Sequence, residues 1–362
     1  MGLVKRTLYQ IIGIKVDMKV VADIDIPFLE GVFEPYGPVV YKKGDQIARE
    51  DVLDADVLIV RTRTRCDRNL LEGTSVKMIA TATIGMDHID MDYCAAHGIH
   101  VENAAGCNAG GVMQYVFSAL YGVAARIGIK IEEFTLGIIG VGHVGSKIEA
   151  MARYLGLNVL LCDPPRAIAE GPEKFCSLEY LLEHSNAVTM HVPLDDMTRG
   201  MADETFFALM RPGAIFINAA RGEVINEQAL IAAAPKLAAI IIDTWCNEPN
   251  INIGLLDVAA IGTPHIAGYS LQGKQNATMM AVQAVARFFD ITELKDFVPV
   301  DQDPTHTPVL LDLKDKNHGE IAAVFQYNYP IFTDDFRLRM EPEKFEKLRG
   351  SYQYRRDIYY NE

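Results

Sequence analysis

The sequence predicts an α/β protein with two parallel sheets, and three observations lead to that prediction. Apolar segments of strand length alternate with helical segments along most of the chain. A glycine-rich turn separates one such strand from a helix near the middle of the chain. The 362 residues, 49% of them hydrophobic, are enough for two or three domains that each have a core.

The first α/β block covers residues 18–105. Its apolar strands are separated by helical or polar residues, as in a parallel sheet that is covered on both faces. Residues 1–17 precede the first clean strand and are expected to be an extension outside the fold. The strands of this block are expected at residues 18–21, 54–61, 76–81 and 99–102.

A second α/β block follows a long helix that is expected over residues 110–125, where apolar residues recur with a helical period. Asp203 and Asn226 are expected to cap two of the later helices. The strands are expected at 136–139, 158–162, 187–191, 214–218 and 238–242, and the helices at 146–155, 203–210, 226–234 and 271–289.

The pattern divides the chain into three domains. The first is expected over residues 18–108 and 267–290, and the second over residues 109–266. A small α+β module is expected over residues 291–362, where aromatic and charged residues crowd together. A module of this composition is more typical of an assembly surface than of a second catalytic unit.

The composition argues against several classes of partner. The chain has 34 Lys and Arg against 48 Asp and Glu, a net charge of −14, which repels nucleic acids and anionic membranes. We find no apolar run of the ~20 residues that span a bilayer, and no signal peptide. Six scattered cysteines without a C-x-x-C pair are typical of reduced thiols. We therefore expect a cytoplasmic protein.

Gly140, Gly142 and Gly145 form a G-x-G-x-x-G pattern between a strand and a helix. The first glycine permits a tight turn, the second lets a pyrophosphate approach the backbone, and the third lets helix and strand pack closely. The next strand ends at Asp163, whose carboxylate can accept hydrogen bonds from ribose hydroxyls and repel a 2′-phosphate. The pattern therefore predicts a dinucleotide-binding Rossmann domain that prefers NAD to NADP. Arg166 weakens that preference, because it can contact a phosphate or stack on adenine.

Arg221 follows the expected strand at 214–218, Glu248 the one at 238–242, and His265 a further short strand at 261–264, so all three lie at the carboxyl ends where ligands bind. An arginine grips a carboxylate with two hydrogen bonds. A histidine accepts a hydroxyl proton while a hydride leaves, and a neighbouring carboxylate fixes its tautomer. Each residue alone is more often part of an ordinary loop, but their order after the glycine-rich turn predicts oxidation of a 2-hydroxy acid.

These motifs resemble those of the D-2-hydroxyacid dehydrogenases, with NAARG at 218–222, DTWCNEP at 243–249 and TPHIAG at 263–268. More specific sequence motifs resemble those of the erythronate-4-phosphate dehydrogenases within that family, and the resemblance extends from about residue 18 to the end. Those motifs are TATIG at 81–85, AGCNA at 105–109, LCDPPR at 161–166, HIAGY at 265–269 and FEKLRGSYQYRRD at 345–357.

The resemblance implies an NAD-binding Rossmann domain, a flavodoxin-like substrate (lid) domain and a C-terminal module that forms a homodimer. It also implies NAD-dependent oxidation of 4-phospho-D-erythronate to (R)-3-hydroxy-2-oxo-4-phosphobutanoate, a step of vitamin B6 synthesis. Arg221 and Glu248 would be active-site residues, and His265 the proton acceptor and donor. Thr62, Thr83 and Tyr269 would contact the substrate. The expected cofactor contacts are Gly140, Gly142, His143, Val144, Gly145, Asp163, Val192, Ala219, Ala220, Arg221, Asp243 and Gly268.

The chain departs from the family at a few of these positions. Val192 stands where a threonine usually bonds the cofactor, and Ala220 and Met86 replace a frequent cysteine and threonine. Thr62 replaces a common serine and keeps the hydroxyl. These changes concern cofactor affinity more than the chemistry.

The substrate phosphate requires cations, and Arg61, Arg63 and Arg65 lie just beyond a strand. In an extended segment such alternate residues share a face. We hypothesise that Arg61 and a tail arginine of the partner subunit, Arg355 or Arg356, hold the phosphate. The alternative is a solvated basic patch.

Two other functions stay open at this stage. One is a sister dehydrogenase that acts on phosphoglycerate or an unphosphorylated acid, and the other is a non-catalytic NAD sensor with the same fold. No metal site is expected, because metal-ligand spacing is absent: His88, His97 and His100 cluster, but His97 and His100 flank a turn glycine and are interpreted as surface residues.

Overall fold

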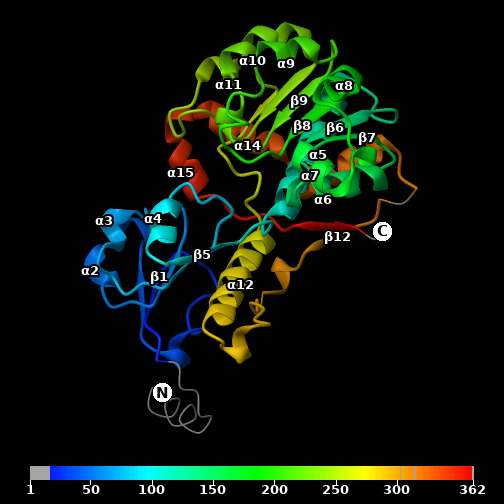
Figure 1. Ribbon diagram of the computed structural model, residues 1–362. Helices are drawn as coiled ribbons and strands as arrows, with labels where there is room; N and C mark the ends of the chain where they lie inside the picture. Colours follow the sequence, from blue (N-terminus) through cyan, green and yellow to red (C-terminus); the bar gives the residue numbers. More distant parts are fainter. Residues whose placement is uncertain (1–16, 302, 314, 361–362) are drawn as a thin grey trace. The chain divides into compact units, whose positions relative to one another are not determined.

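The computed structural model describes residues 17–301, 303–313 and 315–360, and the chain divides into two compact units (Figure 1). Unit 1 consists of Met1–Asn108 and Gln272–His306, and unit 2 of Ala109–Leu271 and Thr307–Glu362. Apart from Asp17, the expected N-terminal extension lies outside the described residues. Each unit is built around a parallel sheet of its own, as the alternation of strands and helices predicts.

The sheet of unit 1 has five parallel strands in the order β2-β1-β3-β4-β5. This is the strand order of flavodoxin-like doubly wound sheets. The strands are β1 Val20–Asp23, β2 Val39–Lys42, β3 Val57–Val60, β4 Met78–Thr81 and β5 His100–Asn103.

Burial explains which of these strands could be predicted from the sequence. Every residue of β1, β3 and β4 is buried, so each strand is a continuous apolar run. Strand β2 was missed because it is a short edge strand whose four residues are all half-buried, which leaves no long apolar run. The helices of unit 1 are α2 Arg49–Val52, α3 Arg68–Leu71, α4 Met91–Ala96 and α12 Leu271–Phe288, which begins on the last residue of unit 2.

The sheet of unit 2 has six parallel strands in the order β11-β10-β9-β8-β6-β7. The chain runs outward from β6 to β7 and then crosses back to β8, so β6 and β8 flank a switch point of the kind where dinucleotides bind. The strands are β6 Thr135–Ile139, β7 Asn158–Cys162, β8 Ala187–Met190, β9 Ile215–Asn218, β10 Ala239–Ile242 and β11 Ile261–Gly262.

The helices of unit 2 follow the expected pattern and add several that were missed. The side chains of Asp203 and Asn226 cap α9 and α10, as expected. Helix α6 begins at His143, directly after the glycine-rich turn, rather than near residue 146. The helices are α5 Ala109–Ile127, α6 His143–Tyr154, α7 Pro164–Glu170, α8 Leu178–His184, α9 Glu204–Leu209, α10 Glu227–Ala233 and α11 Ile253–Val258.

The C-terminal residues 307–360, which we call the tail, pack onto the core of unit 2. Phe325 of the tail stacks on Phe117 of the long buried helix α5, with ring centroids 6.1 Å apart. Asp335 accepts a hydrogen bond of 2.7 Å from the Gly262 backbone N–H, so the tail also covers the β11 edge. The tail contains β12 Val309–Leu311, α13 His318–Asn328, α14 Ile331–Met340, α15 Phe345–Gly350 and β13 Ile358–Tyr360, and β12 pairs with β13.

The domain boundaries differ from the expected ones. The module expected over 291–362 is not a compact unit of its own: residues up to His306 group with unit 1, and the tail groups with unit 2. The second crossing between units falls after Leu271 rather than at residue 267. The reason is physical, because buried aromatic and aliphatic tail residues complete the core of unit 2 instead of forming a separate one.

Within the described part of the chain, the structure contains no helix long and apolar enough to cross a membrane.

Candidate active site

The three expected catalytic residues lie in loops that follow neighbouring strands of unit 2. Strands β9, β10 and β11 are adjacent, and Asn218 is in register with Ile242, which is in register with Gly262. Arg221, Glu248 and His265 follow these three strand ends. The structure therefore brings all three loops to one edge of the sheet, where ligands bind in parallel α/β sheets.

Glu248 and His265 form a directly bonded pair. The imidazole Nδ1 lies 2.8 Å from Glu248 Oε2, and both side chains are mostly buried. The Trp245 backbone N–H donates to the other oxygen, Oε1, at 3.0 Å, so the carboxylate is fixed at both ends. With Nδ1 committed to the carboxylate, Nε2 is the ring nitrogen that can accept a proton.

The charge state of Glu248 suits this arrangement. Burial alone favours the neutral acid, but the hydrogen bond and charge of His265 outweigh burial and hold the pKa of Glu248 below its ordinary value. Glu248 is therefore an anion at neutral pH and stabilises a positive charge on the imidazole beside it.

Asp243 holds the backbone that carries His265. Its carboxylate is buried and accepts hydrogen bonds from Thr263 Oγ1 at 2.6 Å and from the N–H groups of Ile266 and Ala267 at 2.8 and 2.9 Å. Its backbone carbonyl accepts from His265 N–H at 2.9 Å. Burial raises the pKa of Asp243. These contacts hold His265 at φ +55°, a value that a non-glycine residue adopts only when its surroundings impose it.

Two supporting residues were missed from the sequence. Tyr115 of α5 shares a 2.8 Å hydrogen bond with Thr263, and Trp245 Nε1 donates to the Thr263 carbonyl at 2.9 Å. Trp245 and Tyr115 are among the largest fully buried side chains. The presence of a single tryptophan, two residues after Asp243, was an available signal, whereas Tyr115 had none because it looks like an ordinary core position.

Arg221 is a half-buried arginine whose positive charge is not matched by an acid. Among the described residues its guanidinium donates to the Ala220 carbonyl at 2.8 Å and forms no ion pair with a carboxylate. Its backbone is fixed, since Asn218 Nδ2 donates to the Arg221 carbonyl at 2.9 Å. Gly222 lies so close to the backbone of Trp245 that a side chain there would collide with it. The guanidinium is thus held in place with capacity for an anionic ligand.

The glycine-rich turn fits a dinucleotide. Gly140 has φ +83°, and a Cβ there would lie 2.7 Å from the His191 carbonyl oxygen, so only glycine suits the turn. Gly145 packs against the Gly140 carbonyl, whereas the space in front of Gly142 is open. Helix α6 begins at His143 and Val144, and the first N–H groups of a helix have no partner within it. This open cradle at a helix N-terminus suits a pyrophosphate.

Asp163 ends up beside that turn, as the sequence predicts. Its Oδ2 accepts from the Val141 N–H at 2.7 Å, and its Oδ1 accepts from the Arg166 N–H at 3.0 Å, which caps α7. The Arg166 guanidinium bonds to Glu170 and to the Val141 carbonyl. Arg166 is therefore neutralised by an acid of its own helix, which reduces its capacity to attract a 2′-phosphate.

The remaining expected cofactor residues line the ends of neighbouring strands. Val192 follows β8, next to His191, whose pKa burial lowers to about 3, so that this histidine is neutral. Ala220 is buried, while Ala219 and Gly268 are half-buried. All belong to unit 2, as do Gly140, Asp163 and Asp243.

Unit 1 holds three of the four expected substrate residues. Thr83 shares a 2.6 Å hydrogen bond with Thr81 and follows the end of β4, and Thr62 is exposed in the turn after β3. Arg61 is already paired: its Nε donates to the buried Asp23 at 3.2 Å, and Nη1 donates to the Asp25 carbonyl at 3.0 Å. These contacts assign Arg61 a role inside unit 1.

The expected convergence of three arginines after β3 is wrong. Residues 61–64 form a turn, closed by a 3.2 Å hydrogen bond from the Thr64 N–H to the Arg61 carbonyl, and not the extended segment that would align alternate side chains. Arg65 is exposed and bonds to Asp67 at 3.2 Å. Arg61 and Arg65 therefore serve separate acids instead of one phosphate.

The tail arginines also differ from expectation. Arg355 is half-buried within its own chain, where its guanidinium donates to the carbonyls of Gly111, Ile266, Ala267 and Tyr269. It fastens the loop after His265 and is not available to a partner subunit, so that part of the phosphate hypothesis is wrong. Arg356 is exposed and reaches the Thr307 carbonyl at 3.5 Å.

Tyr269, the fourth expected substrate residue, is surrounded by tail side chains. The rings of Tyr352 and Tyr354 lie 6.1 and 6.0 Å from its ring. The guanidinium of Arg349 lies 5.9 Å from the Tyr269 ring centroid, and its Nη1 lies 4.0 Å from Glu248 Oε2. Sequence reasoning did not single out Arg349, although it lies in the LRG of the tail motif.

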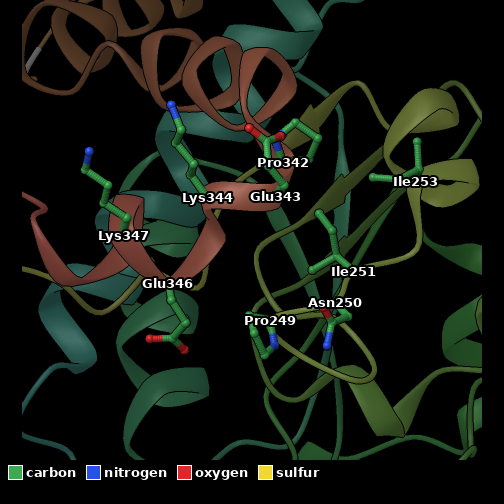
Figure 2. A pocket seen from close by; sticks show the side chains of 9 residues that line it. All are labelled: Pro249, Asn250, Ile251, Ile253, Pro342, Glu343, Lys344, Glu346 and Lys347. Atoms are coloured by element: carbon green, nitrogen blue, oxygen red, sulfur yellow. The ribbon is translucent and has the colours of Figure 1, made fainter.

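A pocket of about 650 Å³ opens beside the site, between the loop after Glu248 and the start of α15 (Figure 2). None of the three expected catalytic residues lines it, so we assign it no part in the chemistry. Its lining residues are Pro249, Asn250, Ile251, Ile253, Pro342, Glu343, Lys344, Glu346 and Lys347.

Metal ligation receives no support within the described part of the chain, where no group of three His, Cys, Asp or Glu side chains is placed to hold an ion. The three histidines considered from the sequence have separate partners: His88 bonds to Thr81, His97 to the Tyr93 carbonyl and His100 to Glu102.

Residues 118–267 match the family model of the D-isomer specific 2-hydroxyacid dehydrogenase NAD-binding domain. The chain is 44% identical to an erythronate-4-phosphate dehydrogenase of Bacteroides thetaiotaomicron over 347 residues, which cover 94% of this chain and 97% of the relative. That match includes most of both units.

Solved structures agree with the fold. An NAD⁺-bound 3-phosphoglycerate dehydrogenase of Entamoeba histolytica aligns with a TM-score of 0.64 and 27% identity, over 79% of this chain and 99% of the other. A D-lactate dehydrogenase of Aquifex aeolicus, in complex with NAD and lactic acid, aligns with a TM-score of 0.65 and 24% identity, over 78% and 100%. Each alignment therefore leaves about a fifth of this chain unmatched.

Proposed function

Because this chain belongs to the erythronate-4-phosphate dehydrogenases, within the D-isomer specific 2-hydroxyacid dehydrogenase family, we propose that it oxidises 4-phospho-D-erythronate with NAD. The product is (R)-3-hydroxy-2-oxo-4-phosphobutanoate, and the reaction belongs to vitamin B6 synthesis. The alcohol at C2 loses a hydride and a proton, and NAD, when bound, would supply the hydride acceptor.

One observation carries the proposal: a bonded His265–Glu248 pair lies on the same sheet edge as Arg221, a guanidinium with no acidic partner among the described residues. In this arrangement His265 Nε2 takes the C2 hydroxyl proton, and Glu248 stabilises the imidazolium that forms. Arg221 holds the substrate carboxylate with two parallel hydrogen bonds and thereby orients C2.

Thr62 and Thr83 of unit 1 and Tyr269 of unit 2 are proposed substrate contacts through their hydroxyl groups. The turn at Gly140, Gly142 and Gly145 is proposed to hold the pyrophosphate, and Asp163 the adenosine ribose. His143, Val144, Val192, Ala219, Ala220, Asp243 and Gly268 complete the proposed cofactor site.

The substrate is tested with a panel of acids. We expect NADH formation at 340 nm with 4-phospho-D-erythronate and a kcat/KM at least 10-fold lower with 3-phospho-D-glycerate, D-lactate and D-erythronate. A parallel arm with an added 2-oxo acid detects turnover when the cofactor stays bound between cycles. A preference for 3-phosphoglycerate would assign the chain to a sister activity, and no turnover with any acid in either arm would favour an NAD sensor.

We also propose that the tail mediates a homodimer. Its helices α13 and α14 expose large apolar side chains, with Tyr327 87%, Phe336 61% and Met340 64% exposed. Clusters of exposed aromatic and aliphatic side chains are typical of protein interfaces. A second copy of the chain is the partner that the resemblance implies.

Analytical ultracentrifugation tests the dimer. We expect the wild-type chain to sediment at twice the 40.1 kDa chain mass, and the Tyr327→Asp, Phe336→Asp double variant to sediment as a monomer. Ile168→Asp is a matched control, because Ile168 is 88% exposed but lies on α7, outside the tail. A wild-type monomer, or a double variant that stays dimeric, would refute this interface.

A further inference from the structure

Arg349 reaches the catalytic pair from the tail. It lies on α15, which is anchored in the core of unit 2 by the buried side chains of Phe345 and Leu348. Burial of these two large apolar side chains stabilises the position of the helix. The place of Arg349 is therefore set by packing, and its guanidinium is held near Glu248 and Tyr269.

The guanidinium of Arg349 is only partly compensated there. Its Nη1 lies 4.0 Å from Glu248 Oε2, which is beyond hydrogen-bond distance, and that oxygen already accepts from His265. Its Nε is buried without a hydrogen-bond partner. A buried donor that is left unpaired destabilises the protein, and more so in a charged group, so a ligand that pairs with it is bound more tightly.

Two other arginines near the carboxyl edge of the unit 2 sheet already form hydrogen bonds or ion pairs. Arg355 donates to four backbone carbonyls, and Arg166 is neutralised by Glu170. Of these four arginines, Arg221 and Arg349 are thus the two with neither a hydrogen-bonded carboxylate nor several backbone carbonyls as acceptors in the described chain. The proposed substrate has two anionic ends, a carboxylate and a phosphate.

We propose that Arg349 binds the C4 phosphate of the substrate, while Arg221 binds its carboxylate. The inference rests on the proposed function and adds a specificity-determining residue to it. The Arg349 guanidinium lies between Glu248, the partner of the proposed base, and the ring of Tyr269, a proposed substrate contact, which are 4.0 and 5.9 Å away. A substrate that contacts both His265 and Tyr269 therefore brings its short phosphorylated end toward this guanidinium. The tail, through Arg349, selects phosphorylated acids in its own chain.

The test compares a phosphorylated and an unphosphorylated substrate. We expect Arg349→Met to lower kcat/KM for 4-phospho-D-erythronate about 10- to 150-fold, mainly through KM, because a hydrogen-bonded ion pair is lost. The kcat/KM for D-erythronate should stay within twofold, which also shows that the variant is folded. Arg349→Lys, which keeps the charge, should restore part of the loss, and Lys347→Met is the matched control on the exposed face of α15.

Three results would overturn the inference. Equal losses with both substrates would mean that Arg349 acts through Glu248 and not on the phosphate. No loss with either substrate would remove Arg349 from the site. Calorimetric binding of 4-phospho-D-erythronate to the NAD-loaded protein separates this inference from the proposed function: if the wild type binds but does not turn over, the function fails, and equal affinity in Arg349→Met makes the inference fail as well.

Discussion

Arg61 and Arg221 follow strands of equivalent kind in two parallel sheets, yet their surroundings differ. At the end of β3 in unit 1, Arg61 donates to Asp23, a carboxylate that is fully buried, and to Asp25. At the end of β9 in unit 2, Arg221 donates only to a backbone carbonyl within the described residues. Arg61 therefore stabilises the fold of unit 1, whereas Arg221 is available to bind a ligand.

The same contrast holds for the histidines of the two units. His88 of unit 1 bonds to a threonine hydroxyl, and burial lowers its pKa, which favours a neutral ring. His265 of unit 2 bonds to a carboxylate that stabilises a charged ring. The comparison teaches that a parallel sheet offers loops at its carboxyl edge in both units, and that the acids beside each loop decide which residue performs chemistry.

Removing the imidazole of His265 should have the largest effect. We expect His265→Asn to lower kcat by about 10²–10⁴-fold, because loss of a general base typically costs that much. His97→Asn is the matched control in unit 1, where an exposed histidine bonds only to a backbone carbonyl. Steady-state kinetics at neutral pH measure both variants. Near-normal turnover of His265→Asn would contradict the assignment of His265 as the general base.

The two arginines should respond in opposite ways to substitution by methionine. Arg221→Met should lower kcat/KM about 10- to 150-fold, because a charge-assisted contact to the substrate carboxylate is lost, and should change the melting temperature little. Arg61→Met should mainly lower the melting temperature, because the buried Asp23 loses its charged partner. Kinetics and thermal denaturation of both variants check this, and an exchange of the two effects would contradict the assignment.

Replacing Asp163 should act on cofactor choice alone. Asp163→Ala should weaken NAD binding about 10-fold or more and improve NADP relative to NAD, because a carboxylate that accepts from the ribose and repels a 2′-phosphate is removed. Fluorescence titration with both dinucleotides measures the ratio. An unchanged ratio would place ribose recognition elsewhere.

The smallest expected effect concerns acid stability. The pKa of Glu248 is held below its ordinary value, so its ionised form stabilises the fold above about pH 4.3, and that contribution is lost as pH falls through the lowered pKa. Glu248→Gln should therefore lower the melting temperature at pH 7, and the difference from wild type should shrink below pH 4. A difference that is independent of pH would show that the charge contributes nothing.

The chemistry-bearing loops could be predicted because short motifs mark them. The glycine-rich turn, Asp163 and the Arg221, Glu248 and His265 series all lie where strand ends were expected, and Glu248 is bonded to His265. Local residue types suffice here, because each loop directly follows a buried apolar strand.

The contacts that join distant segments could not be predicted. Nothing in the sequence marks Arg355 as a clamp on the loop after His265, or Arg349 as a neighbour of Glu248, because both depend on how the tail packs. Residues 61–64 form a turn, although an extended segment was predicted there. Strand β2 was not predicted because it has no buried apolar run. These features arise from tertiary packing, which composition and periodicity do not encode.

The central claim is that unit 2 directs the C2 hydride of 4-phospho-D-erythronate to NAD while His265 takes the C2 hydroxyl proton. The most direct test supplies the substrate with deuterium at C2 and analyses the reduced cofactor by mass spectrometry. The account predicts that wild-type protein transfers the deuterium to the cofactor, and that His265→Asn does so at a rate at least 100-fold lower. Reduced cofactor without deuterium, or undiminished transfer in the variant, would contradict it.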